Sequence, residues 1–145
     1  MNSNSHILII DDETSLRQTM ARILQRAGYE VTAAANGKEG LALVSEHPFD
    51  LLYLDIRMPD MSGLELLKII HIKLPDLPII LFTAQPDLNS AVEALRRGAT
   101  DYLLKPLKPQ TVIDRTQAIL ADKQKERRKR EIQRQIENSM RLYDP

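Results

Sequence analysis

The stretch HILIIDD (residues 6–12) decides the fold, because an uninterrupted apolar run ends abruptly in two carboxylates. Three further runs follow the same plan: LLYLD (51–55) ends in an aspartate, PIILFT (78–83) in a threonine and DYLLK (101–105) in a lysine. Runs of Ile and Leu without polar alternation are typical of strands that are buried on both faces, as in a parallel sheet. The alternating segment 29–35 completes a set of five expected strands.

Segments with apolar residues at helical spacing separate these strands. They lie around residues 16–27, 41–44, 64–70, 91–99 and 112–120. Gly28 is expected to stop the first helix, Asn36-Gly37 predicts a turn before the second, and Val92 and Leu95 belong to the expected apolar face of the fourth. Right-handed crossovers would place helices on both faces of the sheet. We predict a flavodoxin-like, doubly wound α/β fold with five parallel strands in the order 2-1-3-4-5.

The composition is that of one globular domain. The chain has 145 residues, of which 43% are hydrophobic and only 4% aromatic, so the core must be mainly aliphatic. It contains no cysteine, which excludes disulfides and thiolate metal sites. No apolar run is long enough to span a bilayer, and the first residues lack a signal-peptide pattern. We therefore expect a soluble, cytoplasmic protein that does not act at a membrane.

Charge is distributed unevenly along the chain. Residues 1–122 carry 12 Lys and Arg against 16 Asp and Glu, a net charge of −4, whereas residues 123–145 carry 8 against 4, a net charge of +4. We therefore divide the chain into a body, residues 1–121, and a basic extension, residues 122–145. Helix-forming residues dominate the extension, so the last helix of the body is expected to continue into it.

Three interpretations of the extension remain open. A heptad-like seam that would suit a dimer-forming helix consists of Ile132, Ile136, Ser139 and Tyr143. Lys125 and Lys129 would occupy the same seam upstream and oppose pairing there. A solvated linker helix needs no partner at all. Direct nucleic-acid contact is not expected from this chain, because no aromatic residues or reading helix accompany the basic run.

Charged and hydroxyl side chains gather where the expected strands end: Asp11 and Asp12, then Asp55, Thr83 and Lys105. The carboxyl ends of parallel strands share one edge of the sheet, and ligands bind there where the strand order reverses. Three carboxylates at one point repel one another unless a cation neutralises them. A hard ion such as Mg²⁺ prefers oxygen ligands of this kind. The set predicts Mg²⁺-dependent phosphoryl transfer to a carboxylate, with the hydroxyl and the ammonium holding phosphoryl oxygens.

These blocks resemble the receiver domain of two-component response regulators, which has a CheY-like fold. The matching motifs are Ile10-Asp11-Asp12-Glu13, Leu54-Asp55-Ile56-Arg57-Met58-Pro59-Asp60-Met61-Ser62-Gly63, Phe82-Thr83-Ala84, Gly98-Ala99-Thr100-Asp101-Tyr102 and Leu104-Lys105-Pro106. The resemblance covers about residues 6–121, and it is specific because the blocks occur together in the right order and spacing. It implies a phosphorylation-operated signalling domain rather than an enzyme for external substrates, with residues 122–145 as a linker that leads to an output domain or ends the protein.

The resemblance assigns a role to each acid. Asp55 corresponds to the phosphoacceptor, which would take its phosphoryl group from a sensor histidine kinase or a phosphotransfer protein. Asp12 would bind Mg²⁺ directly and Asp11 mainly through water. Asp55 and the backbone carbonyl of Arg57 would complete the protein ligands. The family also usually has a cis peptide bond after the lysine that corresponds to Lys105.

The resemblance also implies a switch. The Thr83 hydroxyl, the Ala84 backbone N–H and Lys105 would hold the phosphoryl oxygens. Phosphorylation adds roughly −1.5 to −2 charges, so Thr83 would move toward the site and Tyr102 would turn inward. The surface of the last two helices and the strand between them would then change, and a homodimer could form through this face or through the extended last helix.

Two positions tune the lifetime of the phosphoryl group in this family, and here they are Arg57 and Gln85. Neither is a carboxylate, and Arg57 could shield the acyl phosphate from water. We therefore predict slow-to-moderate autodephosphorylation.

Two other functions would use similar residues. A Mg²⁺-dependent phosphatase with an Asp nucleophile, similar to the haloacid dehalogenase group, carries its two key acids as Asp-x-Asp at one strand end. Here the acids Asp11 and Asp12 are adjacent, and the candidate nucleophile lies on another strand. A flavodoxin-like FMN binder needs a hydroxyl- and glycine-rich loop after the first strand, where the acids of this chain would repel phosphate. The phosphatase is the principal alternative.

Overall fold

The computed structural model describes residues 5–84 and 87–142. Within them, five strands form one sheet in the order β2-β1-β3-β4-β5, and every neighbouring pair is parallel. The strands are β1 (His6–Ile10), β2 (Glu30–Ala34), β3 (Leu51–Asp55), β4 (Ile79–Thr83) and β5 (Asp101–Leu104). The predicted fold class and strand order are confirmed.

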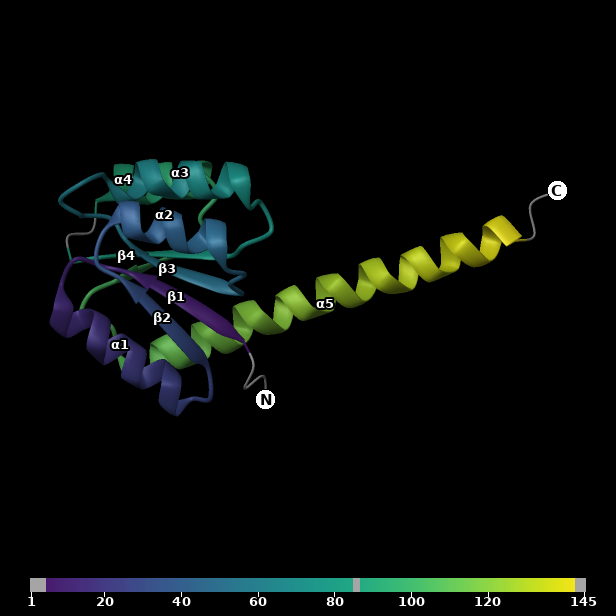
Figure 1. Ribbon diagram of the computed structural model, residues 1–145, viewed down its shortest axis with the longest axis horizontal. Coiled ribbons are helices and arrows are strands. Elements are labelled where there is room, and N and C mark those ends of the chain that lie inside the picture. Colours follow the sequence, from purple (N-terminus) through teal and green to yellow (C-terminus); the bar gives the residue numbers. More distant parts are fainter. Residues whose placement is uncertain (1–4, 85–86, 143–145) are drawn as a thin grey trace.

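Helices alternate with the strands along the described chain. They are α1 (Thr14–Arg26), α2 (Gly37–Glu46), α3 (Gly63–Lys73), α4 (Leu88–Arg96) and α5 (Pro109–Leu142). Helices α2, α3 and α4 cover one face of the sheet, and α1 and the first part of α5 cover the other (Figure 1). Helix α5 then projects far beyond the domain, which confirms its expected continuation. None of the helices in the described ranges is long and apolar enough to cross a membrane.

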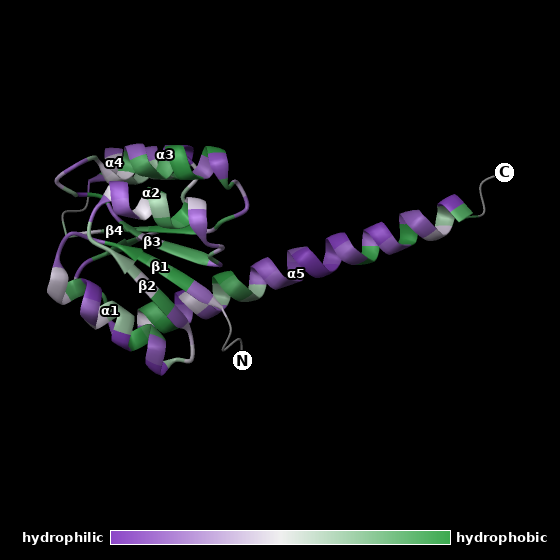
Figure 2. Ribbon diagram, viewed as in Figure 1, coloured by the Kyte–Doolittle hydropathy of each residue, from purple (hydrophilic) through white to green (hydrophobic). Residues whose placement is uncertain are grey.

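The strands supply two cores because successive side chains point to opposite faces of the sheet. Leu8 and Ile10 pack under α2, α3 and α4, whereas Ile7 and Ile9 pack under α1 and α5, and all four are fully buried. Figure 2 shows the strands between the helices as largely hydrophobic and the projecting part of α5 as largely hydrophilic. Only the first third of α5 therefore belongs to the core, and its buried residues are Val112, Thr116 and Leu120.

Two local predictions are wrong. Asn36-Gly37 is not a separate turn: Asn36 caps α2 by accepting a hydrogen bond from the Glu39 N–H at 2.8 Å, and Gly37 is the first helical residue. Asparagine is a favoured N-cap, so the helix begins earlier than its apolar residues indicate. Helix α4 packs through Ala94 and leaves Val92 39% and Leu95 59% exposed. A small side chain at the contact turns the larger residues outward.

Candidate functional site

The carboxyl edge of the sheet brings the strand-end acids together. β1 lies beside β3 with Ile10 opposite Leu54, so Asp11, which follows β1, lies beside Asp55, the last residue of β3. Asp11, Asp12 and Asp55 each offer a carboxylate oxygen, and these oxygens all lie within 4.8 Å of one another. Residues more than 40 positions apart thus form one acidic cluster at the switch point of the sheet.

The three acids differ in burial. Asp11 is completely buried and Asp55 is 4% exposed, whereas Asp12 lies on the surface. Asp11 Oδ1 accepts a hydrogen bond from the Glu13 N–H at 3.1 Å, but Asp11 Oδ2 is buried with no hydrogen-bond partner among the described residues. Burial raises the pKa of the Asp11 carboxyl to about 7, with Asp55 adding to the rise and the Glu13 N–H and Lys105 opposing it.

Lys105 is the cation that faces this cluster. Its Nζ lies 3.5 Å from Asp55 Oδ2 and 3.6 Å from Asp11 Oδ2, and its side chain is only 14% exposed. The ammonium also lies 5.1 Å from the centre of the Phe82 ring. Strand pairing holds the lysine in place, because its backbone N–H donates to the Thr83 carbonyl at 2.7 Å. The Lys105–Pro106 peptide bond is cis, as the family resemblance implies.

The remaining predicted site residues lie at or near the same edge. Thr83 ends β4 and is 2% exposed, and Ala84 follows it at the surface. The Arg57 N–H donates to Asp55 Oδ1 at 3.4 Å, while the Arg57 side chain is exposed. Tyr102 lies on β5, half-buried against the core under α2, α3 and α4, and its hydroxyl is buried with no hydrogen-bond partner in the described part of the chain.

Sequence reasoning missed the contacts that support the loop after Asp55. A Cβ at Gly63 would collide with the Asp55 backbone carbonyl oxygen, so only glycine allows the loop to fold back this tightly. The Asp60 carboxylate accepts hydrogen bonds from the backbone N–H groups of Gly37 and Lys38 at 3.1 and 2.9 Å. These bonds tie the loop to the N-terminus of α2. Gly63 and Asp60 are visible in the sequence, but only the fold identifies the backbone groups that they contact. The two groups that Asp60 contacts lie more than 20 residues away.

The donor set fits a hard cation and a phosphoryl group. A buried carboxylate oxygen without a hydrogen bond is costly, and a cation that prefers oxygen ligands would satisfy Asp11 Oδ2 in addition to the nearby Lys105 ammonium. Lys105 and the buried Thr83 are suited to hold phosphoryl oxygens at the ends of the neighbouring strands. Fold and site together define a doubly wound α/β protein with an acidic, lysine-bearing site at its switch point.

Comparison with known proteins identifies the family within this class. The response regulator receiver domain family matches residues 7–117. The chain is 40% identical over 115 residues to a probable transcriptional regulator, ycf27, of Cyanidium caldarium, over 79% of this chain and 46% of that protein. It is 45% identical over 116 residues to the DNA-binding transcriptional regulator NtrC of Proteus hauseri, over 79% of this chain and 24% of that protein. The chain belongs to the response regulator receiver domain family of two-component systems.

The same relationship holds for solved structures. A CheY-like response regulator receiver domain protein from Methanospirillum hungatei JF-1 is similar with a TM-score of 0.82 and 37% identity, over 84% of this chain and 98% of that chain. In contrast, the chain spans less than half the length of the curated relatives named above. The domain shared with them is a signalling domain.

Proposed function

We propose that this receiver domain accepts a phosphoryl group on Asp55 in a Mg²⁺-dependent reaction and thereby switches its interactions with partners. The observation that carries the proposal is the position of the Asp55 carboxylate, which is nearly buried between two further acids and the ammonium of Lys105. The neighbouring acids can share a cation with this carboxylate, and the Lys105 ammonium can face an incoming phosphoryl group.

In the proposed reaction, an Asp55 carboxylate oxygen attacks the phosphorus of a phosphohistidine on a sensor kinase or a phosphotransfer protein. A P–O bond forms as the P–N bond breaks, and the leaving imidazole nitrogen keeps the electron pair and is protonated. Lys105 would balance the charge of the phosphoryl oxygens. The Thr83 hydroxyl and the Ala84 N–H, at the end of the neighbouring β4, would donate hydrogen bonds to them. We propose that the exchange takes place in the cytoplasm.

The proposed protein ligands of the Mg²⁺ are Asp11, Asp12, Asp55 and the backbone carbonyl of Arg57. When bound, the ion would offset the charge of the carboxylates and of the transferring phosphoryl group. The buried Oδ2 of Asp11, which has no hydrogen-bond partner among the described residues, supports this assignment. As the family resemblance implies, Asp12 is the proposed direct ligand and Asp11 is proposed to act mainly through water.

Thr83 and Tyr102 are the proposed switch pair. Thr83 would move toward the phosphoryl group, and Tyr102 would turn further into the core under α2, α3 and α4. Together these movements would be a shift between two pre-existing conformations. The surface of α4, β5 and α5 would change with it. This surface exposes Leu88 and Leu95 at 79% and 59%, and a homodimer through this face or through the extended α5 is proposed.

We propose residues 1–121 as the receiver unit and residues 122–145 as a basic helical extension or linker. The exposure of all residues from 124 to 142 supports this division, as do the longer relatives named as transcriptional regulators. The receiver chain itself is not proposed to contact nucleic acid.

The proposed lifetime of the phosphoryl group is slow to moderate. The exposed Arg57 side chain, two residues beyond Asp55, could shield the acyl phosphate from water, while Gln85 lies outside the described residues. A lifetime of seconds with Mg²⁺ present would contradict this.

Incubation with acetyl phosphate and Mg²⁺, followed by intact-mass spectrometry, tests the proposal. The chain should gain one phosphoryl group, and Asp55→Asn should abolish the gain. Asp114→Asn, which removes an exposed carboxylate on α5, is the matched control and should be phosphorylated normally.

Other outcomes separate the alternatives. Omission of Mg²⁺, or Asp12→Asn, should slow the reaction strongly. Continuous release of phosphate, with many acetyl phosphate molecules consumed per chain, would instead indicate the phosphatase alternative. Full labelling of the Asp55→Asn variant would refute Asp55 as the acceptor.

A further inference from the structure

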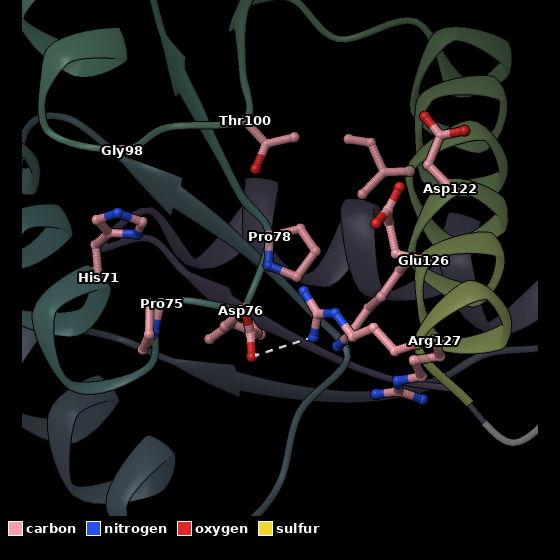
Figure 3. A pocket seen from close by; sticks show the side chains of 13 residues that line it. His71, Pro75, Asp76, Pro78, Gly98, Thr100, Asp122, Glu126 and Arg127 are labelled. Atoms are coloured by element: carbon pink, nitrogen blue, oxygen red, sulfur yellow. Dashed lines mark ion pairs between the residues drawn. The ribbon is translucent and has the colours of Figure 1, made fainter. Parts of the chain in front are cut away.

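Helix α5 crosses the amino edge of the sheet, opposite the acidic cluster, without apolar packing. Leu120 is the last buried residue of α5, and residues 124–142 are all exposed. Two cavities of about 470 and 480 Å³ lie at this edge, and Lys123 and Asp76 line both. Figure 3 shows the first cavity between α5 and the segment around Pro75 and Pro78. Hydrophobic contact therefore does not hold this part of α5 to the domain.

Positive charge is concentrated on α5 at this point. Residues 123–130 include six Lys and Arg and one Glu. Like charges four positions apart on a helix repel each other, and Lys123 with Arg127 and Lys125 with Lys129 are such pairs. Burial lowers the pKa of Lys123, and the neighbouring Arg127 lowers it further. Negative charge from the domain would offset the part of this repulsion that acids of the helix itself, such as Glu126, do not.

Two aspartates of the domain supply that charge. Lys123 Nζ donates to the Asp50 carbonyl oxygen at 3.2 Å and lies 3.9 Å from Asp50 Oδ1. Arg127 lies 4.0 Å from the same carboxylate oxygen. One turn further along, Arg130 lies 3.8 Å from Asp76 Oδ2 (Figure 3). The three cations extend the domain-facing side of α5 beyond its last apolar contact.

Asp50 is itself fixed to the sheet. Its Oδ2 accepts a hydrogen bond from the His6 N–H at 2.8 Å, and its own N–H donates to the His6 carbonyl at 2.8 Å. The side chains of Lys123 and Asp50 are only 16% and 31% exposed, so solvent screens this pair less than a fully exposed one. The exposed Arg130–Asp76 pair adds to a network that already has a fixed centre.

We infer that Asp50 and Asp76 form an ion-pair clamp with Lys123, Arg127 and Arg130 that keeps α5 helical and in one direction as it leaves the domain. The direction of the projecting helix is then set by surface ion pairs rather than by packing in the core. High salt or a competing polyanion would open it. Because it lies at the opposite edge from Asp55, its opening would leave the acidic cluster unchanged.

Distance measurement between two spin labels tests the clamp. The chain has no cysteine, so Lys68→Cys on α3 and Gln135→Cys on α5, both at exposed positions, would carry the only labels. The parent should give one narrow distance distribution at low salt. The double variant with Asp50→Asn and Asp76→Asn should broaden the distance distribution about twofold. NaCl at 1 M should have the same effect, because the screening length is then about 3 Å. Asp50→Asn keeps an oxygen to accept the His6 hydrogen bond, so the fold should persist.

Hydrogen exchange gives the second readout. Amide protection in residues 121–130 should fall about two- to fivefold for each ion pair that is neutralised. This fold-change corresponds to the free energy that exposed ion pairs typically contribute. The matched control Asp114→Asn removes the same charge from α5 outside the clamp and should change neither measurement. Asp76→Arg should broaden the distribution, and the swap Asp76→Arg with Arg130→Asp should restore it.

Two results would overturn the clamp. One is a distance distribution that stays narrow in the double Asn variant and in 1 M NaCl while the protein remains folded. The other is equal loss of protection in the Asp114→Asn control. Labelling of Asp55 by acetyl phosphate is expected to be unaffected in all clamp variants, so failure of the clamp and failure of the proposed phosphorylation are separate outcomes.

Discussion

The two edges of the sheet use the same kinds of side chains in opposite ways. At the carboxyl edge, three carboxylates meet one lysine, and two of the three acids are buried. At the amino edge, Asp50 and Asp76 meet three cations, most of them well exposed. The acids of the first edge are mostly shielded from solvent, whereas the cations of the second are mostly exposed to it.

Burial therefore decides what each cluster can do. Burial, with Asp55 adding to it, raises the pKa of Asp11, and the enclosed carboxylates favour binding of a cation. A solvent-exposed excess of positive charge contributes little energy for each pair and acts mainly on the position of a helix. The carboxyl edge is suited to chemistry and the amino edge to mechanical attachment. Charge changes at the two edges should accordingly have effects of different size and direction.

The largest expected effect is that of Asp11→Asn in the absence of Mg²⁺. The folded-state pKa of Asp11 is raised from 3.8 to about 7, so ionisation of Asp11 destabilises the fold progressively as pH rises through that range. The variant should raise the free energy of unfolding at pH 8 by up to about 4 kcal/mol. Below about pH 4 the gain should vanish, because Asp11 is then protonated in both states. Urea unfolding at the two pH values measures the difference.

Mg²⁺ sharpens this comparison. It should stabilise the parent protein at pH 8 and thereby reduce the advantage of Asp11→Asn. A variant that is less stable than the parent at pH 8 without Mg²⁺ would show that burial of the Asp11 carboxylate does not destabilise the fold.

The next effect compares one lysine from each edge. Lys105→Met should slow phosphorylation by acetyl phosphate about a hundredfold, the scale for losing one fixed charge that faces the transferring group. Lys123→Met removes a similarly enclosed lysine at the amino edge and should leave the rate unchanged. Initial rates from intact-mass spectra would decide this, and equal slowing of both variants would mean that the two edges are coupled.

The smallest effect is expected at Asp60, which lies at the carboxyl edge but is fully exposed. The backbone N–H groups of Lys38 and Gly37 lower the pKa of Asp60. A lowered pKa gives stability that is present above the ordinary value of 3.8 and is lost as pH falls below it. Asp60→Asn should therefore lower Tm slightly at pH 7 and hardly at all at pH 3. Thermal unfolding at both values tests this, and a larger loss at pH 3 would contradict it.

Most of the fold could be predicted because the relevant signals are local or follow from chain topology. Unbroken apolar runs such as residues 6–10 predict buried parallel strands, and parallel strands bring their end residues to one edge. The convergence of Asp11, Asp55 and Lys105 followed from that rule. The outward orientation of Leu95 did not, because it depends on which residue of α4 makes the closest contact with the core.

The same limit applies to the supports of each site. Nothing local shows that Gly63 must pass close to the Asp55 carbonyl, or that Asp60 reaches the N-terminus of α2. The partners of the basic stretch, Asp50 and Asp76, are separated from it by dozens of residues. Such contacts arise from packing, and a single sequence carries no direct record of them.

The sequence by itself determined the strand and helix pattern, the order of the sheet and the set of chemical groups at its carboxyl edge. Those features follow from hydrophobic periodicity and from the geometry of parallel strands, which do not depend on detailed packing. Only the tertiary structure decided that Asp11 is enclosed while Asp12 faces solvent, and that Asp50 lies beneath the basic stretch of α5. Burial and ion pairing depend on distances between distant segments, and these distances exist only once the chain has packed.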